Sequence, residues 1–163
     1  MLILSKEMQA FMFYRYTLII TFGYIAAVCD IKTRRVPNAM VLIMMGAWAV
    51  TIVPYLLWDL GGAVTFIKDA VSGFLTGGLL FMFMYIVSRK GIGGGDVKFI
   101  AAAGLYMGFV GTLVAILSGL IFAGFAALVL MLFKKIGRKD ALPMVPFLYA
   151  GILVALFIGF KLN

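Results

Sequence analysis

Gly91–Lys98 has the sequence GIGGGDVK, a glycine run that closes on the carboxylate of Asp96 between two strongly apolar segments. A backbone without side-chain bulk and with access to positive φ lets another chain approach it closely. A single helix from Asp96 to Lys134 would extend roughly 55 Å, whereas the hydrocarbon core is only about 30 Å thick. We therefore predict two helices that break at Gly108–Gly111, the first of them short. Asp96 would then lie at some depth in the membrane or in a water-filled recess, where an acid indicates function.

The composition is that of an integral membrane protein. Of the 163 residues, 65% are hydrophobic and only 12% are charged, and a soluble domain would need far more polar surface. The net charge of +8 comes from short basic clusters between apolar segments. Retention of loops in the cytoplasm explains such clusters better than nucleic-acid binding does. Cys29 is the only cysteine and histidine is absent, which excludes disulfide frameworks, His/Cys zinc sites and Ser-His or Cys-His nucleophiles. We predict no metal, no cofactor and no nucleic-acid partner.

The apolar segments predict an all-α integral membrane protein, a single domain over residues 1–163 that crosses the bilayer six times. Arg15 interrupts the first span and can snorkel toward the nearer interface. Pro54 should kink the second span or end it early, and residues 59–69 should form a nearly neutral connection to the third. The six predicted spans are Ala10–Cys29, Ala39–Trp58, Ala70–Ser88, Val97–Met107, Thr112–Phe133 and Pro143–Phe160.

The distribution of basic residues predicts the orientation. Ten of the 14 lysines and arginines lie in or beside the first, third and fifth loops. Because loops rich in lysine and arginine stay on the cytoplasmic side, these three loops should be cytoplasmic and both termini should lie outside. Asp30 and Asp96 would then share the cytoplasmic face of a multi-pass protein of the plasma (inner) membrane.

Few residues remain that could carry chemistry. Glu7, Asp59 and Asp69 fall on the predicted outer side, and replacing Asp59 or Asp69 with asparagine should be near neutral. Asp140 lies among basic residues that favour a solvated role. Asp30 and Asp96 are left, each at the junction of an apolar helix and a basic loop. The six acids of the chain are Glu7, Asp30, Asp59, Asp69, Asp96 and Asp140.

Two such carboxylates could hydrolyse a peptide bond. At about 4 Å they would repel by roughly 4 kcal/mol at an effective dielectric near 20, so they would hold one proton between them over a broad pH range. The ionised member can take a proton from water while the protonated member donates to the scissile carbonyl. The simpler alternatives are that Asp30 pairs with Lys32 or Arg34 and that Asp96 only stabilises a helix N-terminus. Neither alternative explains the glycine run.

Three sequence elements resemble the type IV prepilin peptidases, the GxGD membrane aspartic proteases. Asp30 is followed by Pro37-Asn38, the run Gly93–Phe99 is followed by Ala101–Gly104, and Leu142–Leu148 is proline-rich. The elements occur in the family's order and helical context, and they cover essentially the whole chain.

The resemblance implies that Asp30 and Asp96 form the catalytic pair. It also implies that Gly93, Gly94, Gly95, Lys98 and Pro37 belong to the active-site loop or contact the substrate. The substrates would be pilin-like or preflagellin-like precursors in the lipid bilayer. Each would carry a short basic leader ahead of a hydrophobic helix, cut on the cytoplasmic side after a glycine.

The chain resembles a compact, peptidase-only form, because bifunctional members carry an additional segment with paired Cys-x-x-Cys motifs and also methylate the new N-terminus. Such compact forms serve tight-adherence pili or archaeal flagellins. A small proton-coupled carrier that relays protons through intramembrane acids is an alternative. Its weakness is that Asp30 and Asp96 both lie at one face and no acid lies in the middle of a span. A structural assembly platform is a third possibility, but it leaves Asp96 unexplained.

Overall fold

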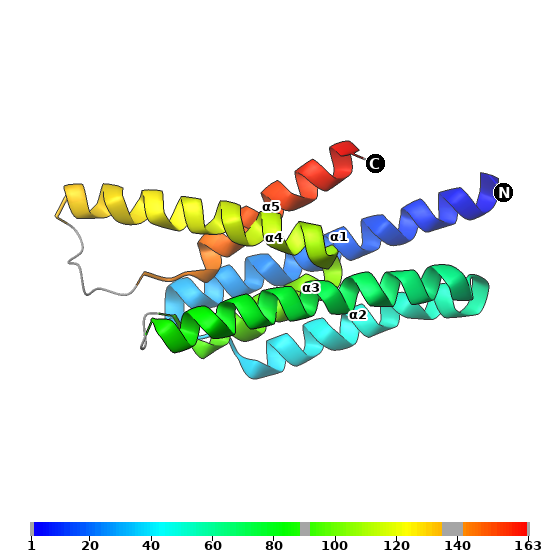
Figure 1. Ribbon diagram of the computed structural model, residues 1–163, viewed down its shortest axis with the longest axis horizontal. Coiled ribbons are helices and arrows are strands. Elements are labelled where there is room, and N and C mark those ends of the chain that lie inside the picture. Colours follow the sequence, from blue (N-terminus) through cyan, green and yellow to red (C-terminus); the bar gives the residue numbers. More distant parts are fainter. Residues whose placement is uncertain (1, 89–91, 135–141, 163) are drawn as a thin grey trace.

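A computed structural model describes residues 2–88, 92–134 and 142–162, and the secondary structure in these ranges is entirely helical (Figure 1). This confirms the all-α class. A bilayer favours it, because the helix satisfies every backbone hydrogen bond within one segment. The helices are α1 (Leu2–Thr33), α2 (Asn38–Trp58), α3 (Leu60–Val87), α4 (Gly94–Leu132) and α5 (Val145–Leu162).

Four stretches within these helices are long and apolar enough to cross a membrane, and the apolar part of α5 is shorter, at Val145–Gly159. Large apolar side chains such as Leu42, Leu79 and Phe125 are exposed on the protein surface, as expected where the surroundings are hydrocarbon. The structure therefore supports a multi-pass membrane protein. The four long candidates are Phe13–Thr33, Asn38–Leu57, Leu60–Val87 and Gly94–Leu132.

Helix α4 breaks at Gly108, which confirms the predicted break. Gly108 has φ 68° and ψ −172°, a conformation that essentially only glycine adopts. The break divides α4 into a first half, residues 94–107, and a second half, residues 109–132. Figure 1 shows the second half running back toward the end of the molecule at which α4 begins. The first half is therefore about 20 Å long at 1.5 Å per residue, too short for a full crossing on its own.

The first half of α4 packs directly against the backbone of α3. A Cβ atom added to Gly73 would collide with the carbonyl oxygen of Gly104, and one added to Gly104 would collide with that of Gly73. One added to Gly77 would lie 2.8 Å from the carbonyl oxygen of Ile100. Small residues allow this approach, which is how helices associate where lipid removes the hydrophobic driving force. The contact holds the start of α4 in a fixed position relative to α3.

Arg15 and Asp69 satisfy the backbone at the break in α4. The Nη2 atom of Arg15 donates to the carbonyl oxygen of Tyr106 at 2.6 Å, at the end of the first half. The N–H of Phe109, at the start of the second half, donates to Oδ1 of Asp69 at 3.2 Å. A cation thus meets a helix C-terminus and an acid meets a helix N-terminus, as the helix dipole favours. The guanidinium of Arg15 also lies over the ring of Phe66, 4.1 Å from its centroid.

The predicted connection over residues 59–69 is wrong, because α3 already begins at Leu60. Asp59 caps it: its Oδ1 accepts from the N–H of Gly62 at 3.0 Å, as an N-cap aspartate does. Helix α2 continues through Pro54 to Trp58 instead of ending early, and α1 begins before the predicted span. Hydropathy finds the part of a helix that lies in hydrocarbon, and these helices extend beyond that part.

Candidate active site

Asp30 lies in the last turn of α1 and is only 5% exposed. Its Oδ2 accepts a hydrogen bond of 3.1 Å from the N–H of Val145, the first residue of α5. The first N–H groups of a helix have no partner within the helix, so a carboxylate placed there is stabilised. The end of α1 is fixed by Arg34, which has φ 51° and donates its N–H to the carbonyl oxygen of Asp30 at 2.8 Å. The carboxylate of Asp30 therefore joins α1 to α5.

Asp96 lies in the first turn of α4 and is 7% exposed. Its Oδ2 accepts from the N–H of Gly93 at 3.0 Å, and its own N–H donates to the carbonyl oxygen of Gly93 at 3.0 Å. This reciprocal pair closes the N-terminus of α4. Asp96 thus has the dipole-stabilised position that the simpler interpretation proposed, but it is also buried.

Among the described glycines of the run, Gly95 allows a close approach, and Gly93, Gly94 and Gly95 have no unusual backbone torsions. Gly93 has φ −77°, and Gly94 and Gly95 already belong to α4. A Cβ atom on Gly95 would lie 3.2 Å from the Cβ of Val36 and 3.3 Å from its nitrogen, so the loop before α2 packs on this glycine. A Cβ atom on Gly94 would meet nothing within 4 Å. One glycine brings the two aspartate segments together, and its neighbour leaves open space beside them.

Both aspartates line one cavity of about 370 Å³, which we call the dyad cavity. The two carboxylates are close enough to interact electrostatically. The walls come from the end of α1, the loop before α2, the start of α4 and the segment before α5. The residues around it are Asp30, Arg34, Arg35, Val36, Asn38, Gly93, Gly94, Gly95, Asp96, Leu142, Pro143 and Met144.

The alternative in which Asp30 forms an ion pair does not describe its surroundings. Asp30, Lys32 and Arg34 all belong to the described part of the chain, and there the hydrogen bond of the Asp30 carboxylate goes to Val145. Arg34 acts on Asp30 only through a longer-range electrostatic attraction. Asp96, which lines the same cavity, is the acid among the described residues that can share its chemistry.

Two predicted site residues lie outside the dyad cavity. Pro37 is the N-cap of α2, where its carbonyl oxygen accepts from the N–H of Met40 at 3.1 Å. The Nζ atom of Lys98 donates to Oδ1 of Asn38 at 3.0 Å, and Lys98 lines a neighbouring cavity and not the dyad cavity. Asp140, predicted to be solvated, falls outside the described residues.

Arg34, Arg35 and Asn38 line the dyad cavity and were not among the predicted site residues. Their position in the sequence could have identified them. They lie in the short loop between Asp30 and the second span, and a short loop must stay near the helix end that precedes it. Among the described residues, no group of three or more His, Cys, Asp or Glu side chains could hold a metal ion. The dyad cavity contains two buried carboxylates, each held by a backbone N–H at the start of a different helix.

The sequence of this chain matches a known protein family. The type IV leader peptidase family matches residues 17–160, a range that contains both aspartates. The chain is similar to a prepilin leader peptidase/N-methyltransferase of Pectobacterium carotovorum subsp. carotovorum, at 32% identity over 113 residues. The similarity covers 64% of this chain and 38% of the length of that relative. No solved structure matches. The family match confirms the resemblance predicted from the sequence, and the chain belongs to the type IV leader peptidase family.

Proposed function

We propose that this protein is a membrane aspartic endopeptidase and that Asp30 and Asp96 are its catalytic pair. The observation that carries the proposal is the dyad cavity, which is lined by two buried carboxylates from distant parts of the chain, each at the end of an apolar helix. Membership in a leader peptidase family supports the same reaction class. Two carboxylates of opposite protonation state can hydrolyse an amide without a nucleophilic side chain.

The reaction divides the two roles between the carboxylates. The ionised carboxylate takes a proton from a water molecule, whose oxygen attacks the scissile carbonyl carbon. The protonated carboxylate donates its proton to the carbonyl oxygen, giving a neutral tetrahedral diol. When the diol collapses, the C–N bond breaks, the protonated carboxylate gives its proton to the leaving nitrogen, and one hydroxyl of the diol gives its proton to the ionised carboxylate as the new carboxyl group forms. The backbone N–H groups of Gly93 and Val145 donate hydrogen bonds that orient the carboxylates of Asp96 and Asp30. This orientation keeps the geometry that such catalysis needs.

The proposed substrates are pilin-like or preflagellin-like precursors with a short basic leader, cut after a glycine. A peptide must be extended before its carbonyl can be attacked, and the surface at Gly94 is open enough for an extended segment to lie against the backbone. We place the site at the cytoplasmic side of the plasma membrane in a six-span protein. The excess of basic residues in the first, third and fifth loops supports this orientation.

The activity is tested with the purified protein in detergent and a pilin-like precursor. We expect intact-mass analysis to show a product shortened by the leader, with the cut after the glycine. An Asp59→Asn variant serves as the control, because asparagine is as good an N-cap as aspartate and Asp59 lies away from the dyad cavity. A purified, folded protein that leaves the precursor intact would refute the proposal.

The orientation is tested separately in intact cells. On a Cys29→Ser background, single cysteines at Thr33 and Gly61 are treated with an impermeant thiol reagent. Both positions are exposed, so reagent access is limited only by the membrane. We expect labelling at Gly61 and protection at Thr33. Labelling at Thr33 would place the dyad cavity on the outer side, away from any cytoplasmic leader.

A further inference from the structure

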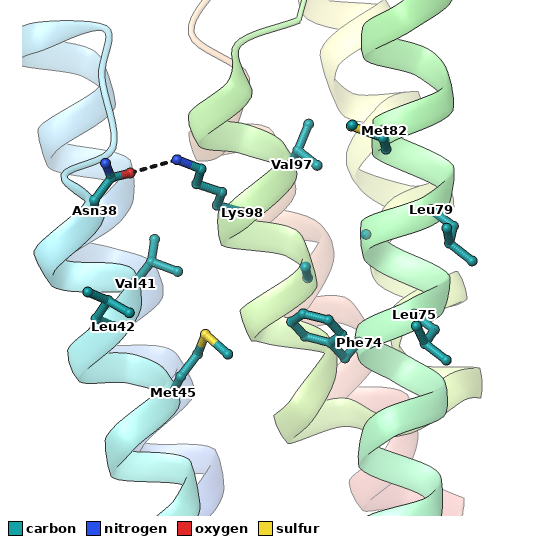
Figure 2. Close-up of a pocket in the computed structure, with 12 residues that line it drawn as sticks. Asn38, Val41, Leu42, Met45, Phe74, Leu75, Leu79, Met82, Val97 and Lys98 are labelled. Carbon is teal, nitrogen blue, oxygen red and sulfur yellow. Dashed lines mark hydrogen bonds between the residues drawn. The ribbon is translucent and has the colours of Figure 1, made fainter.

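A second cavity lies beside the dyad cavity, between α2 and α3 with the first half of α4 behind it. Its volume is about 600 Å³. Figure 2 shows the apolar side chains of α2 and of α3 on its two sides. We call it the α2–α3 groove and define it by Leu42 and Met45 of α2, Leu79 and Met82 of α3, and Gly78 and Ala101.

Packing differs along the two helices in a way that creates the groove. Toward their shared end at Asp59, α2 and α3 are joined by aromatic stacking. The ring centroids of Trp48 and Phe66 are 6.1 Å apart, and those of Tyr55 and Phe66 are 5.1 Å apart. Toward the dyad cavity no such stacked pair is found among the described residues, and α3 packs instead on α4, where a Cβ atom on Gly78 would lie 3.4 Å from the Cβ of Ala101. The groove thus has Gly78 and Ala101 at its base, and its walls are apolar side chains that include the ring of Phe74.

The groove is continuous with the dyad cavity. Asn38 lines both, and its side chain accepts the hydrogen bond of Lys98 at the end of the groove nearest the aspartates (Figure 2). The remaining lining is apolar. From Asn38 to Met45 along α2 the groove is about 10 Å long, or two helical turns. Its exposed side chains include Leu42 at 67% and Leu79 at 66%.

We propose that the α2–α3 groove binds the first turns of the precursor's apolar helix, on the mature side of the bond that is cut. This inference rests on the proposed function. A chain whose scissile bond lies between Asp30 and Asp96 must leave the dyad cavity, and its next residues are the start of a membrane helix. The groove begins at Asn38, at the boundary of the dyad cavity, and it offers apolar walls to that helix. A lipid chain could fill the same space, but it would have no connection to the cavity.

The groove would therefore position the substrate. Anchoring the helix beside the aspartates would fix the distance of the scissile bond from them, and binding energy would be used for placement. The hydrogen bond between Lys98 and Asn38 joins α4 to α2 at the boundary and holds the groove in register with the cavity. Specificity for precursors would then depend partly on the apolar segment after the cut.

Cleavage kinetics provide the first test. The probe is a synthetic precursor in lipid nanodiscs, with a lysine-containing leader, a glycine and about 20 apolar residues. Gly78→Leu places a side chain in the groove, and we expect kcat/KM for the probe to fall about tenfold, mainly through KM. Gly46→Leu is the matched control, because Gly46 is also in a helix, lies outside the groove and has nothing within 4 Å of an added Cβ. Equal kcat/KM values for Gly78→Leu and the control would overturn the proposal.

Photo-crosslinking provides a second test that does not depend on turnover or on tolerance of Gly78→Leu. A photoreactive phenylalanine replaces Leu79 in the Asp96→Asn protein, and a second protein carries it at Leu128. The two positions are similarly exposed, at 66% and 63%. We expect the probe to be crosslinked at Leu79 and only lipid to be crosslinked at Leu128. If both positions crosslink only to lipid, the proposal that the groove binds the precursor's helix is overturned. If the wild-type protein fails to cut the probe, the proposed function fails, and the crosslinking still decides whether the groove binds the helix.

Discussion

Asp30 and Asp69 make the same kind of hydrogen bond in two different places. Each accepts a backbone N–H at the start of another helical segment, from Val145 at 3.1 Å and from Phe109 at 3.2 Å. Asp30 is buried and shares a cavity with a second acid, Asp96. Asp69 is exposed and shares a cavity with a cation, Arg15. The capping bond is therefore common to both acids, and Asp30 differs by its burial and by the second carboxylate in its cavity, which Arg34 and Arg35 also line.

The difference follows from charge. An acid beside an arginine is stabilised as a carboxylate, which suits a permanent helix cap. An acid beside another acid is not, since like charges at short range favour one shared proton. The region around the break in α4 is thus built for stability. The dyad cavity places two like charges together, an arrangement that costs stability and that hydrolysis can use.

The largest expected effect is the loss of cleavage when either aspartate of the dyad cavity is replaced. In Asp30→Asn and Asp96→Asn the amide can still accept the capping N–H from Val145 or Gly93, so the fold should persist. Neither amide can share the proton or activate water, and we expect each variant to lose at least about 10²- to 10⁴-fold in rate. Cleavage assays combined with circular dichroism separate lost chemistry from lost structure. A folded variant with near-wild-type turnover would remove that aspartate from the pair.

The next effect concerns the break in α4. Gly108→Ala forces a side chain into a conformation with φ 68°, and its Cβ would collide with the carboxylate of Asp69. We expect the variant to lose about 1 to 3 kcal/mol of stability from the backbone strain alone. A lower midpoint of thermal unfolding in detergent would show this loss. An unchanged midpoint would mean that α4 does not need the break at this residue.

A smaller effect is expected at Asp69 itself. Asp69→Ala removes the acceptor for the N–H of Phe109 and the acid near Arg15, which should cost about 1 kcal/mol, as for other helix caps. The rate of cleavage by the folded fraction should stay within about twofold of wild type. Thermal unfolding and initial rates measured on the same preparation test both statements. A large fall in rate without a fall in stability would give Asp69 a part in the reaction and end the contrast with Asp30.

The sequence was sufficient to predict the helical class, the break near Gly108 and the two buried acids. The break was required because the apolar segment after Asp96 is too long for one helix to fit the thickness of the bilayer. The two acids could be chosen because the chain has few acids in all. The caps at the break could not be predicted, because Arg15 and Asp69 reach Tyr106 and Phe109 only once the helices are packed. For the same reason Asp69 was expected to be near neutral.

Within the site, which side chains reach the dyad cavity depends on how the helices pack, and the spacing along the chain did not predict it. Lys98 follows Asp96 by two residues, yet its side chain leaves the cavity and bonds to Asn38. Successive positions on a helix point in different directions, so proximity in sequence did not give proximity to the carboxylates. The glycine run predicted a backbone that another chain can approach closely. That Val36 of this same chain approaches Gly95 became known only from the fold.

The central claim is that Asp30 and Asp96 act as one device, and the double variant tests it most directly. If each carboxylate works only with the other, then Asp30→Asn/Asp96→Asn should cleave the precursor no more slowly than either single variant, within about threefold. The rates are measured side by side on the folded fraction, with Asp140→Asn included as the acid expected to matter little. Rate losses that multiply in the double variant would contradict a shared device. An active Asp30→Asn together with an inactive Asp140→Asn would show that the partner of Asp96 is Asp140.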